Sequence, residues 1–235
     1  MNPARKVRIA AWLGLVLLAA VSLAQRSSLQ DQIAQHEQKL AAARASGSLR
    51  EEATELNFLG MMYRQAGKPQ KALEDLNAVL PIEQRAGNQA AQAMTENTMG
   101  RVYTDLGQED KALALFNQAL PVWRTLRIRQ AEANTLNYMG KSYDNLGQRE
   151  EALKNLNASL SIWRELDNGQ AKTQVEQNHA LPQSWRETGG RAGEAATLDN
   201  LGTTYSDMGQ GTEALDYFNQ ARPSGGKWAN RAAKP

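Results

Sequence analysis

The chain has 235 residues, of which 41% are hydrophobic, so it is long and apolar enough to bury a substantial core. It has no cysteine and two histidines, His36 and His179. This composition excludes disulfides, thiolate metal sites and a cysteine nucleophile, and it leaves little for acid-base chemistry. We therefore expect a protein that is not an enzyme, with no catalytic residues, no metal and no cofactor.

The charge is distributed unevenly along the chain. The formal net charge is +2, but seven basic residues lie near the two ends and leave a formal charge of −5 on the rest. A body of that charge would repel a phosphate backbone. Nucleic acid is therefore not an expected partner.

Residues 1–24 have the pattern of a signal peptide. Three basic residues precede an apolar stretch over residues 9–24, and Ser22 and Ala24 are the small residues that a signal peptidase needs. The apolar stretch is about 16 residues long, shorter than the roughly 20 of a comfortable membrane span. We predict export with cleavage before Gln25, to the periplasm or out of the cell. The alternative is an uncleaved anchor in the inner membrane, in which case this segment is the chain's only expected membrane contact.

Residues 25–50 are predicted to form a capping helix. Leu29, Ile33, His36 and Leu40 recur at helical spacing, and the opposite side is filled by Gln, Glu and Lys. We expect His36 to be a semi-buried packing residue of this helix rather than a ligand-binding group.

An internal repeat of 40 residues follows, with three copies over residues 51–169 and a last copy over residues 191–223. In each copy a glycine follows an apolar residue, a tyrosine comes three positions later, and a second glycine, an alanine and a Leu or Phe follow in order. The aligned residues are Gly60, Gly100, Gly140 and Gly202; Tyr63, Tyr103, Tyr143 and Tyr205; Gly67, Gly107, Gly147 and Gly209; Ala72, Ala112, Ala152 and Ala214; and Leu76, Phe116, Leu156 and Phe218. Pro81, Pro121 and Pro223 close three of the four copies.

Each repeated feature has a mechanical reason in a pair of antiparallel helices. The first glycine and the alanine allow the helices to approach closely, while the tyrosine and the Leu or Phe fill the space between them. The second glycine ends the first helix because it tolerates the left-handed backbone conformation. One repeat is therefore predicted to be one helical hairpin.

Residues 170–190 are interpreted as a degenerate, truncated repeat. Gly140 and Gly202 lie 62 positions apart, 18 fewer than two full repeats. We expect a short bent helix over residues 171–186, broken near Pro182, and the weakest or most kinked part of the array there. Residues 224–235 are expected to be a basic disordered tail.

These motifs resemble the tetratricopeptide repeat family, in which a Leu-Gly pair, Tyr, Ala, an aromatic residue and a late Pro occur in this order. The 40-residue period resembles the longer repeats of kinesin light chains and bacterial signalling proteins, whereas the family's usual period is 34. The family's early tryptophan is replaced here by Leu56, Glu96, Leu136 or Leu198. The resemblance implies an all-α, right-handed solenoid of antiparallel helix pairs. HEAT-like helical repeats are the alternative fold.

By resemblance, a peptide groove would be lined by the first helix of each repeat on the concave face. The matching residues are three asparagines and three cations: Asn57, Arg64, Asn97, Arg101, Asn137 and Lys141. An asparagine amide can bind both polar groups of a peptide backbone, and the cations can meet a carboxylate. The alternative is that the asparagines bond neighbouring helices and the cations are solvated. The periodic Trp123, Trp163 and Trp185 are expected to pack between repeats.

The function predicted on this basis is a non-catalytic scaffold that binds a protein or peptide. Two alternatives remain open. The chain could be the detached recognition part of a longer bacterial protein, for example one that carries a caspase-like protease domain. It could also be a structural component of envelope assembly.

Overall fold

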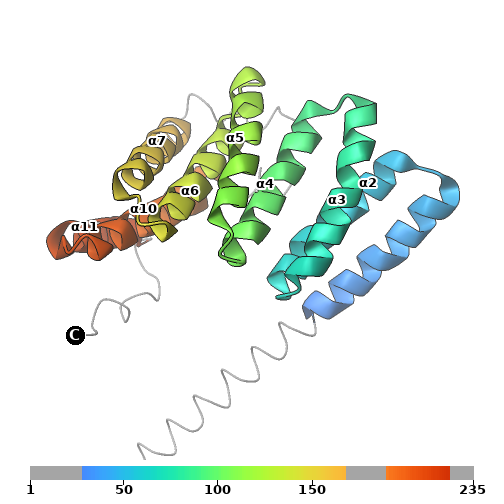
Figure 1. Ribbon diagram of the computed structural model, residues 1–235, viewed down its shortest axis with the longest axis horizontal. Helices are drawn as coiled ribbons and strands as arrows, with labels where there is room; N and C mark the ends of the chain where they lie inside the picture. The colour runs from blue at the N-terminus through green and yellow to red at the C-terminus, as the bar shows by residue number, and fades with distance from the viewer. Residues whose placement is uncertain (1–27, 168–188, 223–235) are drawn as a thin grey trace, which may run out of the picture. The chain divides into compact units, whose positions relative to one another are not determined.

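The computed structural model describes residues 28–167 and 189–222, and within these ranges the chain forms nine helices packed in consecutive pairs (Figure 1). The predicted signal or anchor segment 1–24, the bent helix over residues 171–186, Trp185 and the tail 224–235 lie outside the described residues. None of the described helices is long and apolar enough to cross a membrane. The all-α class predicted from the repeat is confirmed for the described part of the chain.

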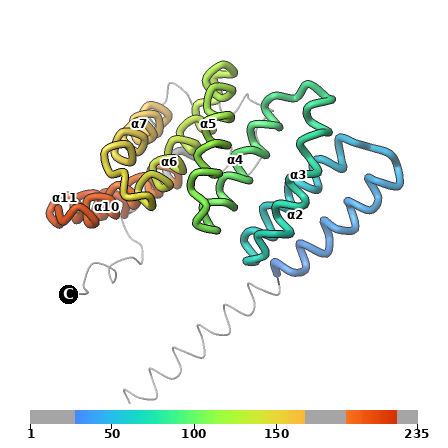
Figure 2. The backbone as a smooth tube through the Cα atoms, viewed as in Figure 1, coloured from blue at the N-terminus to red at the C-terminus, as the bar shows by residue number. Residues whose placement is uncertain are grey.

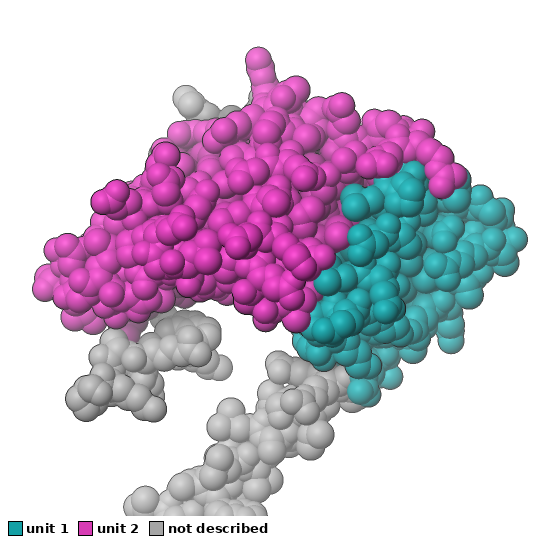
Figure 3. Space-filling model, viewed as in Figure 1, with its two compact units in different colours: residues 1–82 teal, residues 83–235 magenta. Residues whose placement is uncertain are grey.

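The molecule divides into two compact units, residues 1–82 and residues 83–235 (Figure 3). The described part of unit 1 has a helix over residues 28–46, then α2 (Leu49–Gln65) and most of α3 (Pro69–Ala86). In unit 2 the helices are α4 (Gln89–Asp105), α5 (Glu109–Thr125), α6 (Arg129–Asn145), α7 (Arg149–Asp167), α10 (Gly189–Asp207) and α11 (Gly211–Ala221). The first helices of the repeats are α2, α4, α6 and α10, and the second helices are α3, α5, α7 and α11.

In unit 1 the helix over residues 28–46 contacts α2 through polar side chains. His36 Nδ1 lies 2.6 Å from Glu55 Oε2, and its ring centroid is 5.0 Å from that of Phe58. The Tyr63 hydroxyl donates to Glu37, whose Oε1 also accepts from Lys71 Nζ at 3.2 Å. His36 is partly buried, at the place expected for a packing residue of this helix.

The first glycine of each repeat is required by the side chain opposite it. A Cβ atom at Gly60 would lie 2.6 Å from Leu76 Cγ, and one at Gly100 would lie 2.5 Å from Phe116 Cε1. Such distances are too short for carbon atoms, so only glycine lets the two helices of a repeat pack at this separation. The corresponding pairs in the later repeats are Gly140 with Leu156 and Gly202 with Phe218. The predicted role of these glycines is confirmed.

The second glycine of each repeat ends the first helix in the left-handed conformation, as predicted. Gly107 has φ +68°, and the next amide, Gln108 N–H, donates back to the carbonyl of Tyr103 at 2.9 Å. This bond satisfies a carbonyl that the end of a helix would leave without a partner. Equivalent bonds join Lys68 to Tyr63, Gln148 to Tyr143 and Gln210 to Tyr205.

Two of the prolines that close the repeats in sequence, Pro81 and Pro121, do not end the second helices. Pro81 lies inside α3, which continues to Ala86, and Pro121 lies inside α5, which continues to Thr125. A proline inside a helix removes one backbone hydrogen bond without preventing the turns that follow it. The second helices α3 and α5 are therefore longer than the motif alone indicates.

The two described tryptophans pack between helices, as expected. Trp123 is 2% exposed and lies with Ala93, Ala119 and Ala131 in a cluster drawn from α4, α5 and α6. Trp163 is 3% exposed and packs with Leu136, Met139 and other residues of α5, α6 and α7. In unit 2 these clusters join the first helix α6 to the second helices on both sides of it, α5 and α7.

The stack of unit 2 continues from α7 to α10, although residues 168–188 separate them in sequence. α10 packs on α7 and α6 in the way that α6 packs on α5 and α4 (Figure 2). Ser159 Oγ of α7 and Thr197 Oγ1 of α10 are 3.1 Å apart inside this contact. Among the described helices, α10 therefore takes the place of the next first helix.

Candidate functional site

The six candidate peptide-binding residues lie on three first helices and are divided between the two units. Asn57 and Arg64 belong to α2 in unit 1, where Asn57 is buried and Arg64 is half-buried. The other four belong to unit 2: Asn97 and Arg101 lie on α4, and Asn137 and Lys141 lie on α6. Four of the six candidate residues therefore lie in unit 2.

A cavity of about 510 Å³ opens among α4, α6, α7 and α10, and we call it the first-helix cavity. It brings together three of the candidate residues, Arg101, Asn137 and Lys141. The described residues that line it are Arg101, Gln130, Asn134, Asn137, Tyr138, Lys141, Trp163, Ala192, Gly193, Ala196, Asp199 and Asn200. The lining thus combines cations, amides and aromatic rings from four helices.

Arg101 is held against an aromatic ring at the wall of this cavity. Its guanidinium carbon is 4.7 Å from the ring centroid of Tyr138, which in turn stacks on Phe116 at 6.0 Å. A cation over a ring face is attracted by the ring's electron density. Lys141 of the same cavity is exposed, so its ammonium group is accessible from solvent.

The two asparagines of unit 2 bond neighbouring first helices. Asn97 is 3% exposed, and its Nδ2 donates to Thr135 Oγ1 of α6 at 2.6 Å. Asn137 is 6% exposed, and its Oδ1 accepts from Asn200 Nδ2 of α10 at 2.9 Å. These bonds agree with the alternative interpretation, in which the asparagines hold neighbouring helices together instead of binding a peptide.

Two buried polar atoms of cavity-lining residues have no hydrogen-bond partner within the described part of the chain. They are the acceptor Gln130 Oε1 and the donor Trp163 Nε1. Trp163 also occupies the space next to Gly193, where a Cβ atom would overlap the indole ring. Gly193 therefore allows α10 to lie directly against the tryptophan.

Sequence reasoning missed Gln130, Asn134, Tyr138, Trp163 and the residues of α10 as parts of this site. One signal was available, because Gln130, Asn134, Asn137 and Lys141 are separated by four, three and four residues and form one polar stripe of a helix. Among the α10 residues, Asp199 carries a sequence signal, because it stands three positions before Gly202, as Asn137 stands before Gly140. Their position follows from the packing of α10 on α6, which the 62-residue spacing conceals.

Metal binding finds no support in the residues that the structure describes, where no group of three or more His, Asp or Glu side chains could hold an ion. Among the described residues that line the first-helix cavity, there is one carboxylate, Asp199, and there are two cations, Arg101 and Lys141. Its chemistry is that of a surface which accepts anionic and hydrogen-bonding groups.

Comparisons with known proteins identify the repeats. Residues 50–125 match one sequence model described as a tetratricopeptide repeat, and residues 195–222 match another with the same description. No curated protein sequence matches the chain.

Several solved structures share the fold. BtubC (BKLC) from P. vanneervenii has a TM-score of 0.64 at 17% identity, over 96% of this chain and 88% of that one. A Podosopora anserina protein, described by its nearly identical TPR-like repeats of kinesin light chain type, has a TM-score of 0.58 at 20% identity, over 84% and 87%. MamA has a TM-score of 0.50 at 16% identity, over 82% and 86%. At these identities the similarity is one of fold.

Proposed function

The chain contains tetratricopeptide repeats, and from this premise we propose that it is a non-catalytic scaffold which binds a protein or peptide in the first-helix cavity. Tetratricopeptide domains are typically protein-binding scaffolds and are usually not catalytic. The proposed ligand is a polypeptide segment with carboxylate groups, lying along the concave face of a right-handed array. A crystal structure in which the helix pairs wind left-handedly would contradict that part of the proposal.

One observation carries this function: Arg101, Asn137 and Lys141, on two different helices, line one cavity. The cations can pair with a carboxylate of the ligand, and the amides of Gln130, Asn134 and Asn200 can bond its backbone. Tyr138, which is partly buried, adds aromatic surface, and such surface contributes binding energy through the area that binding removes from water.

Affinity capture with a charge-reversed variant tests the proposal. The chain and its Arg101→Glu/Lys141→Glu variant are used as baits, and bound proteins are quantified by mass spectrometry. We expect the variant to lose its specific partners by roughly tenfold or more, because each reversal replaces an attractive pair with a repulsive one. Lys154→Glu is the matched control, since Lys154 is an exposed cation of α7 outside the cavity. Equal recovery by the wild-type chain and the double variant would rule out this groove.

We further propose that residues 1–24 direct export and are removed before Gln25. The support is the sequence pattern alone: basic residues, an apolar stretch and small residues at positions 22 and 24. Expression in a bacterial host followed by fractionation and N-terminal sequencing should give a chain that starts at Gln25 outside the cytoplasm. Leu17→Arg, which places a charge in the apolar stretch, should leave the chain uncleaved. A full-length chain in the membrane fraction would instead indicate the anchor.

A further inference from the structure

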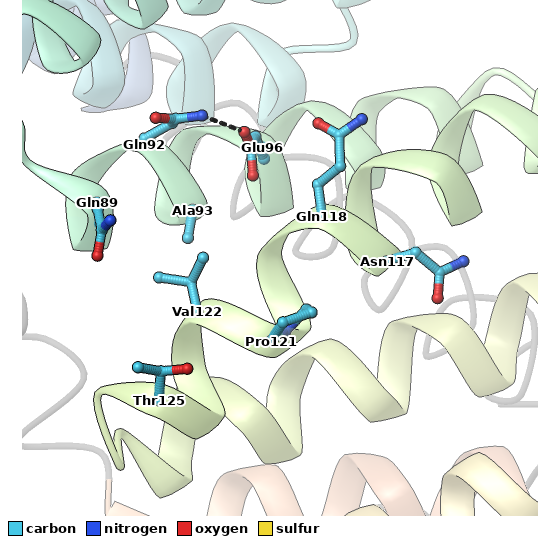
Figure 4. A pocket seen from close by; sticks show the side chains of 9 residues that line it. All are labelled: Gln89, Gln92, Ala93, Glu96, Asn117, Gln118, Pro121, Val122 and Thr125. Atoms are coloured by element: carbon cyan, nitrogen blue, oxygen red, sulfur yellow. Dashed lines mark hydrogen bonds between the residues drawn. The ribbon is translucent and has the colours of Figure 1, made fainter.

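A second cavity, of about 560 Å³, lies between the beginning of α4 and the end of α5 (Figure 4). It shares no lining residue with the first-helix cavity. Its lining is Gln89, Gln92, Ala93, Glu96, Asn117, Gln118, Pro121, Val122 and Thr125, and we call it the Glu96 cavity. Ala93 and Glu96 of α4 are buried, whereas Asn117, Gln118 and Thr125 are exposed along α5.

Glu96 occupies a position that the other repeats give to a core leucine. The aligned Leu56, Leu136 and Leu198 are 1%, 4% and 3% exposed, and Glu96 is 5% exposed. A carboxyl group thus stands where the pattern calls for an apolar side chain, and a cavity opens beside it. Burying a carboxyl group costs free energy unless a hydrogen bond or an opposite charge compensates for its lost hydration.

The compensation within the described part of the chain is small. Gln92 Nε2 donates to Glu96 Oε1 at 2.8 Å, and this is the hydrogen bond that the structure provides for the carboxyl group (Figure 4). Burial raises the pKa of Glu96, while the bond from Gln92 lowers it. None of the nine lining residues is a cation. The carboxylate therefore lacks a counter-charge in its own cavity.

The lining suits a cationic side chain with an aliphatic stem. The carboxylate, the amide oxygens of Gln89, Asn117 and Gln118, and the Thr125 hydroxyl can all accept hydrogen bonds, and a guanidinium group has five N–H donors and no acceptor. Ala93, Pro121 and Val122 supply apolar surface for the stem. We propose that the Glu96 cavity binds an arginine or lysine side chain of a partner polypeptide. This site does not depend on the first-helix cavity.

The test uses the full chain and follows its backbone amides by NMR. Nα-acetyl-arginine amide is the probe, and the uncharged, nearly isosteric Nα-acetyl-citrulline amide is its control. The arginine probe should shift the amides of Gln92, Ala93 and Val122 saturably, and citrulline should bind at least about tenfold more weakly because the charge-assisted bond is absent. Glu96→Gln should weaken the arginine probe by a similar factor, whereas Lys141→Ala, in the other cavity, should not.

Two further measurements, on the Glu96→Leu variant and with guanidinium chloride as the probe, complete the test. Glu96→Leu, which restores the residue of the other repeats, should abolish the shifts while raising the melting temperature. Guanidinium chloride without a stem should bind more weakly than the acetylated amino acid. The proposal is overturned if the two probes bind equally, if Glu96→Gln or Glu96→Leu retains wild-type binding, if guanidinium ion alone binds as tightly, or if no saturable shift occurs at all.

Discussion

Arg127 adopts a backbone conformation that earlier repeats give to glycine. Its φ is +55°, and the residues 40 and 80 positions earlier are Gly87 with φ +65° and Gly47 with φ +70°. A residue other than glycine is strained in this conformation, because its Cβ atom comes too close to the neighbouring backbone atoms. The exposed Arg127 side chain brings no interaction of its own among the described residues that would offset this strain.

We therefore expect Arg127→Gly to stabilise unit 2 by about 0.5–1 kcal/mol in urea unfolding. Arg127→Ala is the matched control, because it removes the side chain but keeps the Cβ atom. It should be less stable than the glycine variant. Equal stability of the two variants would show that the backbone at this turn is not strained.

Glu96 predicts a pH dependence of stability. Burial raises its pKa in the folded state, so between the ordinary glutamate pKa and the raised value the folded chain binds more protons than the unfolded chain. The contribution of Glu96 to the free energy of unfolding therefore decreases as pH rises through that window. Glutamine does not titrate, so the stability of Glu96→Gln relative to wild type should increase with pH.

Urea unfolding of both chains at several pH values measures this difference. Other carboxyl groups whose pKa burial raises, such as Asp144, are present in both chains and cancel in the comparison. A difference that stays constant from acid to neutral pH would mean that Glu96 ionises as it would in water.

At the scale of the helix pair, the contact between the first glycine and the residue opposite it holds the repeat together. At Gly100 a Cβ atom would meet the ring of Phe116, which is fully buried and cannot move aside without disturbing the core. Gly100→Ala should gain up to about 1 kcal/mol of helix propensity, but the clash should outweigh it. We expect a net loss of about 1–3 kcal/mol.

Gly211→Ala is the matched control for this change. Gly211 also lies in a helix, at the start of α11, but a Cβ atom there would meet nothing within 4 Å. Its stability should change by less than about 0.5 kcal/mol in thermal or urea unfolding. If Gly100→Ala were equally harmless, the close approach of α4 and α5 would not matter.

The parts of the fold that the sequence predicts are those set by constraints within one repeat. The glycines at the turns and at the helix contact follow from backbone conformation and side-chain volume, so their spacing in sequence predicts the helical hairpins. The position of α10 does not follow from this spacing. Gly202 lies 22 residues further from Gly140 than one repeat, and the sequence pattern indicates a truncated repeat between them. As a result, the hydrogen bond from Asn200 to Asn137 cannot be predicted from the sequence.

The candidate site is predictable in part, because the repeat fixes which positions lie next to the first glycine. Arg101 and Lys141 were found by aligning positions next to the first glycine, and they do line one cavity. The side-chain partners of the asparagines were not predictable, because bonds such as Asn97 to Thr135 depend on the lateral spacing of neighbouring helices. Glu96 departs from the repeat pattern in sequence, but only the packing shows that it is buried beside a cavity.

At the scale of the whole molecule, the proposed function requires that Arg101, Lys141 and the other residues of the first-helix cavity form one binding surface in unit 2. Selection from a random peptide library displayed on phage measures this most directly, with the wild-type chain and the Arg101→Glu/Lys141→Glu variant as parallel targets. We predict that the wild-type chain enriches peptides rich in Asp and Glu, and that these peptides bind the variant at least about tenfold more weakly. Enrichment of the same peptides by both targets, or of none by the wild-type chain, would contradict the account.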